Sequence, residues 1–145
     1  MKSVLLLLHL TFVGIWLGCV LTEALFERAL LGKGRAQELI LVALHKRVDI
    51  FVEIPAFVVV LVTGVFMFTA ANANPLLITQ IAFGLLAIAA NVYCVWLVFR
   101  RASAASAGRR EEFAHLDHWQ HKVGAMVLFA IVVALSIGIY RFDHV

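Results

Sequence analysis

The fold is decided by residues 54–99, IPAFVVVLVTGVFMFTAANANPLLITQIAFGLLAIAANVYCVWLVF, which contain no Asp, Glu, Lys or Arg. A membrane-spanning helix needs about 20 mainly apolar residues, so this stretch is too long for one span and fits two. Asn72-Ala73-Asn74-Pro75 interrupts it with a strong turn signal. The sequence therefore predicts two antiparallel membrane helices that are joined by a short uncharged turn.

Two further apolar runs flank this pair of helices. Residues 3–22 carry no charge except an optional one on His9, and residues 123–140 are uncharged up to Arg141. Only 14% of the 145 residues are charged, whereas soluble domains carry about a quarter, so the composition argues against a soluble protein. We expect one all-α domain over residues 1–145, an integral membrane bundle of four transmembrane helices at roughly residues 3–30, 38–71, 76–101 and 112–141.

Basic residues gather in two of the three connections between the predicted helices and in the adjoining helix ends. These nine are Arg28, Lys33, Arg35, Lys46, Arg47, Arg100, Arg101, Arg109 and Arg110. Lys and Arg in short loops stay on the cytoplasmic side of a membrane, so we expect both termini to lie outside the cytoplasm of a bacterial inner membrane. The formal net charge of +3 is then explained by basic loops beside anionic lipids, and it predicts no nucleic-acid partner.

Acidic residues and histidines lie at the same end of the predicted bundle as the basic loops. His45, Asp49 and Glu53 follow one another at four-residue spacing, so they share a helix face. They form a polar stripe about 12 Å long. The other members are Glu23, Glu27, His115, His118 and His121. Because the helices are antiparallel, three of them direct carboxylates and imidazoles at one region.

This mixture of carboxylate and imidazole suits an ion of iron, zinc, copper or manganese, and helical bundles build metal sites from inward Glu and His residues. The candidate metal ligands are Glu23, His45, Asp49, Glu53, His118 and His121. Asp117 is placed to orient the ring of His121, and Glu27 is expected to be solvated. Glu53 favours this hypothesis most, because an ionisable group beside a long apolar run is costly. The predicted function is metal binding at the cytoplasmic end, for redox chemistry or storage.

Three alternatives to a metal ion remain open. The acidic residues could be interfacial charges paired with Arg28, Lys46 or Arg47. The chain could instead be a b-type haem protein with His45 and either His118 or His121 as axial ligands, exchanging electrons with quinone, although a low-spin haem prefers two histidines in an apolar pocket. It could also be a subunit for transport or assembly in which His9 and Glu53 relay protons or metal ions. The lipid bilayer is a partner in every case, and a metal-delivery or electron-transfer partner and a homo-oligomer stay open.

His9 is separate from this cluster. His9, Trp16 and Glu23 recur every seven residues, which places them near one inward face of the first helix. The rise from His9 to Glu23 is about 21 Å, so one small metal site cannot hold both. His9 is therefore either a buried, hydrogen-bonded histidine, with Thr63, Gln80 and Ser136 near its level, or a haem ligand, a copper ligand or a proton relay.

Parts of the first two helices resemble known membrane proteins. Leu8-His9-Leu10 with Gly14-Ile15-Trp16-Leu17-Gly18 resembles the first helix of the copper-resistance D (CopD) domain and of HemJ-type protoporphyrinogen oxidases. His45-Lys46-Arg47, Ile54-Pro55-Ala56 and Thr63-Gly64 resemble the second helix of the HemJ type. The resemblance covers roughly the first 70 residues and implies a small multi-helix membrane fold.

The resemblance also implies that His9 matches a histidine that binds haem or copper in the family. Gln80 stands where the HemJ type has a lysine, and the carboxylate and histidine cluster is not part of that pattern. The resemblance therefore implies the fold and a metal-related role rather than porphyrinogen oxidation.

Overall fold

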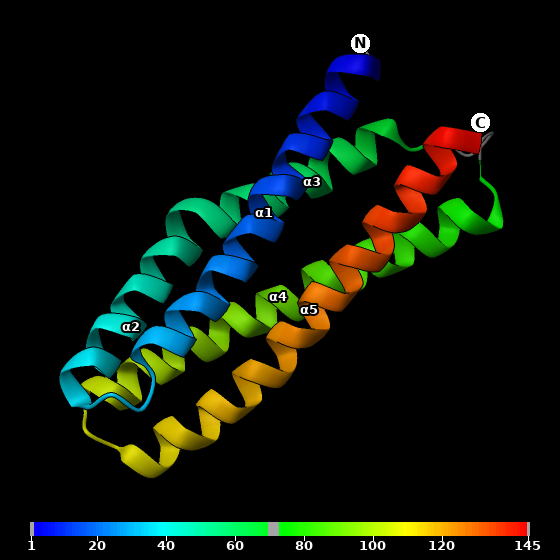
Figure 1. Ribbon diagram of the computed structural model, residues 1–145. Helices are drawn as coiled ribbons and strands as arrows, with labels where there is room; N and C mark the ends of the chain where they lie inside the picture. The colour runs from blue at the N-terminus through cyan, green and yellow to red at the C-terminus, as the bar shows by residue number, and fades with distance from the viewer. Residues whose placement is uncertain (1, 70–72, 145) are drawn as a thin grey trace.

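The computed structural model describes residues 2–69 and 73–144, with side chains through residue 142. Its elements are α1 (Lys2–Leu30), α2 (Arg35–Val48), η1 (Asp49–Glu53), α3 (Ile54–Met67), α4 (Pro75–Ser106) and α5 (Arg110–His144). The described residues contain no β-strand. Figure 1 shows four long rods side by side, because α2, η1 and α3 follow one another as one continuous helix.

All four rods are long and apolar enough to cross a membrane, over Lys2–Leu30, Arg35–Met67, Pro75–Ser106 and Arg110–Phe142. The predicted all-α bundle of four transmembrane helices is thereby confirmed. The second rod begins at Arg35, before the expected residue 38. Helix α4 runs past the expected residue 101 to Ser106, because residues 102–106 are all Ala or Ser and Ala favours a helix. The second rod ends at Met67, while residues 70 and 71 of its expected C-terminal end lie outside the described residues.

Glycine and asparagine fix the ends of the helices. Gly32 and Gly34 between α1 and α2 have φ angles of 71° and 119°, a region that glycine adopts without steric cost. Asn74 caps α4 by accepting a hydrogen bond from the backbone N–H of Leu77 at 2.8 Å, and Pro75 begins the helix. The predicted turn is thus confirmed for its described residues, Ala73 to Pro75, while Asn72 lies outside them.

The rods form two pairs, α1 with the second rod and α4 with α5. Within each pair a short loop joins the two rods, and both of these loops lie at the same end of the bundle (Figure 1). Small buried residues on the inner faces, such as Ala56, Ala87 and Ala130, let the helices approach closely. Trp16 packs on Phe57 in the same core, with ring centroids 5.9 Å apart. Large apolar side chains remain exposed on the outer faces, as expected for helices that contact lipid.

Candidate metal centre

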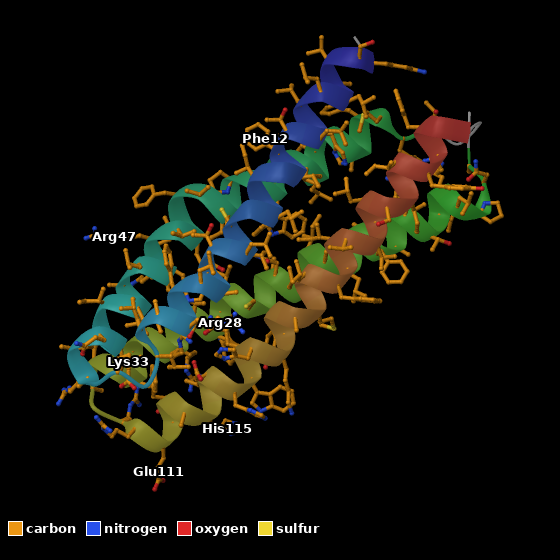
Figure 2. The ribbon with its side chains drawn as sticks, viewed as in Figure 1. Phe12, Arg28, Lys33, Arg47, Glu111 and His115 are labelled. Atoms are coloured by element: carbon orange, nitrogen blue, oxygen red, sulfur yellow. The ribbon has the colours of Figure 1, made fainter. Side chains whose placement is uncertain are left out.

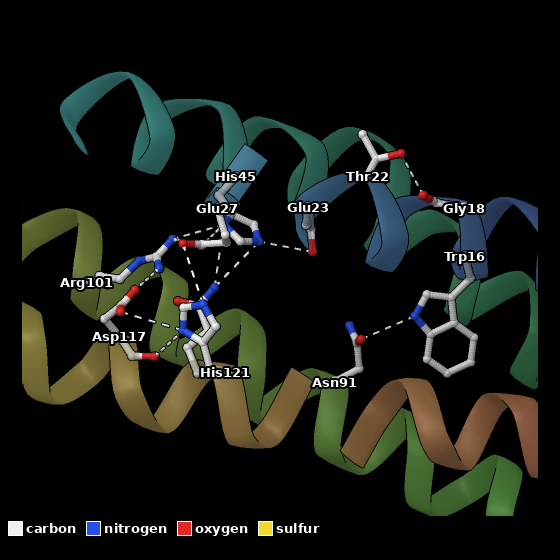
Figure 3. A network of polar contacts seen from close by, with 11 residues as sticks. Trp16, Gly18, Thr22, Glu23, Glu27, His45, Asn91, Arg101, Asp117 and His121 are labelled. Carbon is white, nitrogen blue, oxygen red and sulfur yellow. Dashed lines mark hydrogen bonds and ion pairs between the residues drawn. The ribbon is translucent and has the colours of Figure 1, made fainter. Parts of the chain in front are cut away.

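A network of buried polar side chains lies between the rods, toward the end with the loops (Figure 3). Its buried members are Glu27, His45, Asp49, Glu53, Asn91, Arg101 and Gln120. They come from α1, α2, η1, α4 and α5, so every rod contributes. Outside this network, Arg47 and Glu111 point away from the bundle (Figure 2), as charges at a membrane surface do.

His45, in the last turn of α2, connects two glutamates of α1. Its Nε2 atom lies 3.0 Å from Oε2 of Glu23, and its Nδ1 atom lies 3.1 Å from Oε1 of Glu27. Glu23 and Glu27 are four residues apart and therefore lie one above the other on the same face of α1. The imidazole ring is thus fixed at both nitrogens by carboxylates.

Asp49 and Glu53 owe their positions to the π-helical segment η1, in which the backbone N–H of Ile54 donates to the carbonyl oxygen of Asp49 five residues earlier. Pro55 helps to explain this local widening, because proline has no N–H and its ring clashes with the carbonyl four residues before it. In an α-helix, two successive four-residue steps advance about 80° around the axis. The wider π-helical turn counteracts this rotation, so all three side chains face the inside of the bundle. The exposed fractions are 3% for His45, 1% for Asp49 and 3% for Glu53. Such segments occur frequently at functional sites.

Glu23, His45 and Asp49 offer one ligand atom each, and these atoms all lie within 4.8 Å of one another. Oε1 of Glu23 and Oδ2 of Asp49 are buried and have no hydrogen-bond partner among the described residues. Zinc binds such nitrogen and oxygen atoms at about 2.0–2.2 Å, so a small closure of these side chains would bring all three onto one ion. We call Glu23, His45 and Asp49 the inner site.

Glu53 extends the network away from the loops. Its side chain interacts with those of Asp49 and Asn91, and Nε1 of Trp16 donates to Oδ1 of Asn91 at 3.2 Å. Polar contacts therefore continue past the inner site toward the middle of the bundle, where Figure 3 shows the hydrogen bond between Trp16 and Asn91.

Arg101 is the fixed positive charge of the network, although the sequence places it in a basic loop. Its Nη1 atom donates to Oδ1 of Asp117 at 2.6 Å. Its Nη2 atom forms an ion pair with Oε1 of Glu27 at 2.7 Å and lies 2.9 Å from Nδ1 of His45. A helical pattern could have revealed it, because Asn91, Val98 and Arg101 are spaced by seven and three residues on the buried face of α4. Sequence reasoning also missed Asn91 and Gln120; the Gln120 amide nitrogen lies 3.5 Å from His45.

The histidines of α5 differ in position. His121 joins the network, since its Nδ1 atom lies 2.8 Å from the carbonyl oxygen of Asp117 and its Nε2 atom lies 4.0 Å from Oε2 of Glu27. Glu27, Asp117 and His121 form a second group of ligand atoms within 4.8 Å of one another. His118 and His115 are exposed and belong to neither group. The three residues from His118 to His121 fall about 60° short of a full turn, which leaves His118 outside.

The network is rich in acid. It contains five carboxylates, from Glu23, Glu27, Asp49, Glu53 and Asp117. One arginine opposes them, together with two histidines that are charged only when protonated. Unpaired charges buried away from water are costly, so the carboxylates require bound protons or a bound cation.

Two expectations about the acidic residues are wrong. Glu27 is not solvated, because it is 8% exposed and contacts both His45 and Arg101. The buried carboxylates do not depend on Arg28, Lys46 or Arg47, which are all exposed. Lys46 lies over the ring of Phe99 instead, 4.9 Å from its centroid.

His9 lies apart from both groups. Its Nδ1 atom is 2.9 Å from Oγ1 of Thr63, which is the hydroxyl partner expected at its level. Gln80 accepts a hydrogen bond from Arg141 at 2.9 Å near the other end of the bundle. The candidate haem ligands His9, His45 and His118 thus lie in three separate environments.

No protein-family model, curated protein or solved structure matches this chain. The resemblance to CopD and HemJ-type helices therefore stays a prediction. The function has to be argued from the chemistry of the network.

Proposed function

We propose that this chain binds a divalent transition-metal ion within the membrane through Glu23, His45 and Asp49. The observation that carries the proposal is the set of three buried ligand atoms within 4.8 Å, which includes carboxylate groups with unpartnered buried oxygens. A site with three protein ligands leaves a coordination position for water or a substrate. The ion would also supply the positive charge that the five carboxylates require.

The surroundings of His45 support this assignment. Metal-bound histidines commonly donate the other ring N–H to a carboxylate, which fixes the orientation of the ring. Glu27 is in that position beside Nδ1, and Arg101 holds Glu27 in turn. The Nε2 atom faces Glu23. Arg101 also lies 2.9 Å from Nδ1, so Nε2 becomes available to an ion when Nδ1 carries the proton and donates it to Glu27.

The ligand chemistry favours zinc, iron or manganese. Carboxylate oxygens and an imidazole suit these ions. Copper(II) accepts the same atoms but prefers a square-planar or tetragonal arrangement, and copper(I) prefers thiolate and thioether ligands. Glu53, next to Asp49, would serve as a further ligand or as a proton acceptor. Iron or manganese would permit redox chemistry, and any of the three ions would permit storage or transport. The basic loops favour a site on the cytoplasmic side of a bacterial inner membrane.

A second candidate function is a relay of protons or ions through the bundle. It is favoured by the polar contacts that continue from Asp49 through Glu53 and Asn91 to Trp16, because ionisable residues inside spans mark such pathways. A b-type haem has less support, because both ring nitrogens of His45 face carboxylates and His118 is exposed.

Elemental analysis and the visible spectrum of the purified protein test the proposal. We expect about one transition-metal ion per chain and no haem absorption, consistent with a three-ligand site. Asp49→Asn preserves the shape and removes the charge, so it should lose the ion, while the exposed control Glu111→Gln should retain it. An unchanged metal content in Asp49→Asn, or no ion in the unmodified protein, would refute the metal proposal.

A further inference from the structure

The second group of ligand atoms, Glu27, Asp117 and His121, lies between the inner site and the protein surface. The exposed fraction of the side chain falls from 47% at His121 to 15% at Asp117, 9% at Glu27 and 4% at His45. Polar groups therefore lead from solvent at the loop end of the bundle to the buried ligands. We call Glu27, Asp117 and His121 the outer site.

The hydrogen bonds of His121 fix which ring nitrogen is free. Its Nδ1 atom lies 2.8 Å from the backbone carbonyl oxygen of Asp117, and a carbonyl oxygen only accepts, so Nδ1 carries the proton. In the neutral ring, Nε2 then presents a lone pair toward Glu27.

Oε2 of Glu27 faces that lone pair from 4.0 Å. This oxygen is buried and has no hydrogen-bond partner among the described residues. The separation is too long for a direct hydrogen bond, even with a doubly protonated ring. Two ligands of a tetrahedral ion lie about 3.4 Å apart when each bond measures about 2.1 Å, so a small approach of these two side chains would let both bind one ion.

Glu27 contacts both sites. Its Oε1 atom lies 3.1 Å from Nδ1 of His45, while Oε2 faces His121. We propose that Glu27, Asp117 and His121 bind a divalent metal ion from solvent and pass it to the inner site by way of Glu27. This inference rests on the proposed function, because it assumes that the inner site holds a metal.

The charges around the two sites give the transfer a direction. Arg101 occupies one oxygen each of Glu27 and Asp117, which are two of the three outer ligands, whereas it lies against one inner ligand, His45, at 2.9 Å. Its fixed positive charge therefore opposes a cation more strongly at the outer site. The inner site has two carboxylate ligands with Glu53 beside them. The outer site should therefore bind a metal ion less tightly than the inner site. A lower affinity is what a site needs if it passes its ion on.

The test is the rate at which cobalt(II) enters the purified protein, followed by the visible absorption of the bound ion in a stopped-flow instrument. His121→Ala should fill the inner site roughly tenfold more slowly, because the outer site loses its nitrogen ligand and the loss of a group that supports a metal site lowers affinity about 10–100-fold. The final occupancy of the inner site should be unchanged. His115→Ala, an exposed histidine on the same helix, should behave like the unmodified protein.

Three outcomes would overturn the inference. Equal filling rates in His121→Ala and the unmodified protein would show that the outer site takes no part in loading, while the proposed function would stand. Loss of all cobalt from His121→Ala would show that His121 is a ligand of one combined site. Failure of the unmodified protein to bind cobalt would remove the metal proposal itself, together with this inference.

Discussion

Asp49 and Glu53 occupy the two ends of the π-helical segment η1, and both side chains face the same buried network. The segment ends two residues before Pro55, which cannot donate a backbone hydrogen bond. Together with His45 one turn earlier, they line up three polar residues along one rod. The local departure from α-helical geometry therefore builds the acidic wall of the candidate metal centre.

Glu53→Gln is expected to weaken metal binding by roughly 10–100-fold, the range found for residues that support a metal ligand. The substitution preserves the shape of the side chain but removes a charge beside Asp49. The measurement is the metal retained after dialysis against a competing chelator. Glu111→Gln is the control, since Glu111 is exposed at the start of α5. Equal retention by Glu53→Gln and the unmodified protein would exclude a role for Glu53 at the site.

The fold and the end of the bundle at which these polar residues gather could be predicted from the sequence. Long runs without Asp, Glu, Lys or Arg define spanning helices by a simple energetic rule, and antiparallel connections put the helix ends that carry Glu23, His45 and His121 at one level. Neither step depends on how each helix is rotated about its axis. The structure accordingly agrees with both predictions.

The rotation of the helices could not be predicted in the same way. His118 and His121 have the same chemistry and differ by about 60° around α5, yet only His121 reaches Glu27. Arg101 follows Arg100 in what reads as a basic loop, although α4 continues through both. Which of two neighbouring residues faces the network depends on side-chain packing between helices, and a single sequence shows this only weakly.

Arg101→Met is expected to destabilise the protein by about 3–5 kcal/mol, because removing one partner of a buried ion pair leaves the other charge uncompensated. Arg101 is 0% exposed and binds two carboxylates. The free energy of unfolding can be measured by titration with sodium dodecyl sulfate in mixed micelles. The matched control is Arg100→Met. The Arg100 side chain is 52% exposed and pairs with Glu112, so this substitution should lower the free energy of unfolding by only about 0–1 kcal/mol. A similar loss in both variants would contradict the central role of Arg101.

His9→Ala is expected to leave the metal content unchanged, since about 21 Å of helix separates His9 from Glu23. The loss of the hydrogen bond to Thr63 should lower the free energy of unfolding by about 1 kcal/mol. The cost stays small because the Thr63 hydroxyl keeps a second partner, the carbonyl oxygen of Val59, to which it donates at 2.7 Å. Elemental analysis and detergent unfolding measure the two effects. Loss of the metal in His9→Ala, but not in Asp49→Asn, would instead favour the haem or copper ligand that the resemblance to the CopD and HemJ groups implies.

The orientation of the bundle determines from which side the outer site would take its ion. Eight of the nine Lys and Arg residues in the two basic loops are exposed, and only Arg101 is buried. The remaining eight still outnumber the basic residues near the termini, Lys2 and Arg141, so both loops should lie in the cytoplasm.

Reporter fusions in a bacterial host test this orientation. Alkaline phosphatase fused after Val145 should be active, because this reporter works only outside the cytoplasm, and a fluorescent reporter that requires the cytoplasm should stay dark there. The same pair inserted between α4 and α5, at Gly108, is the control and should give the opposite result. An inactive phosphatase and a bright fluorescent fusion after Val145 would reverse the orientation. His121 would then face the exterior, and the outer site would collect metal from outside the cell.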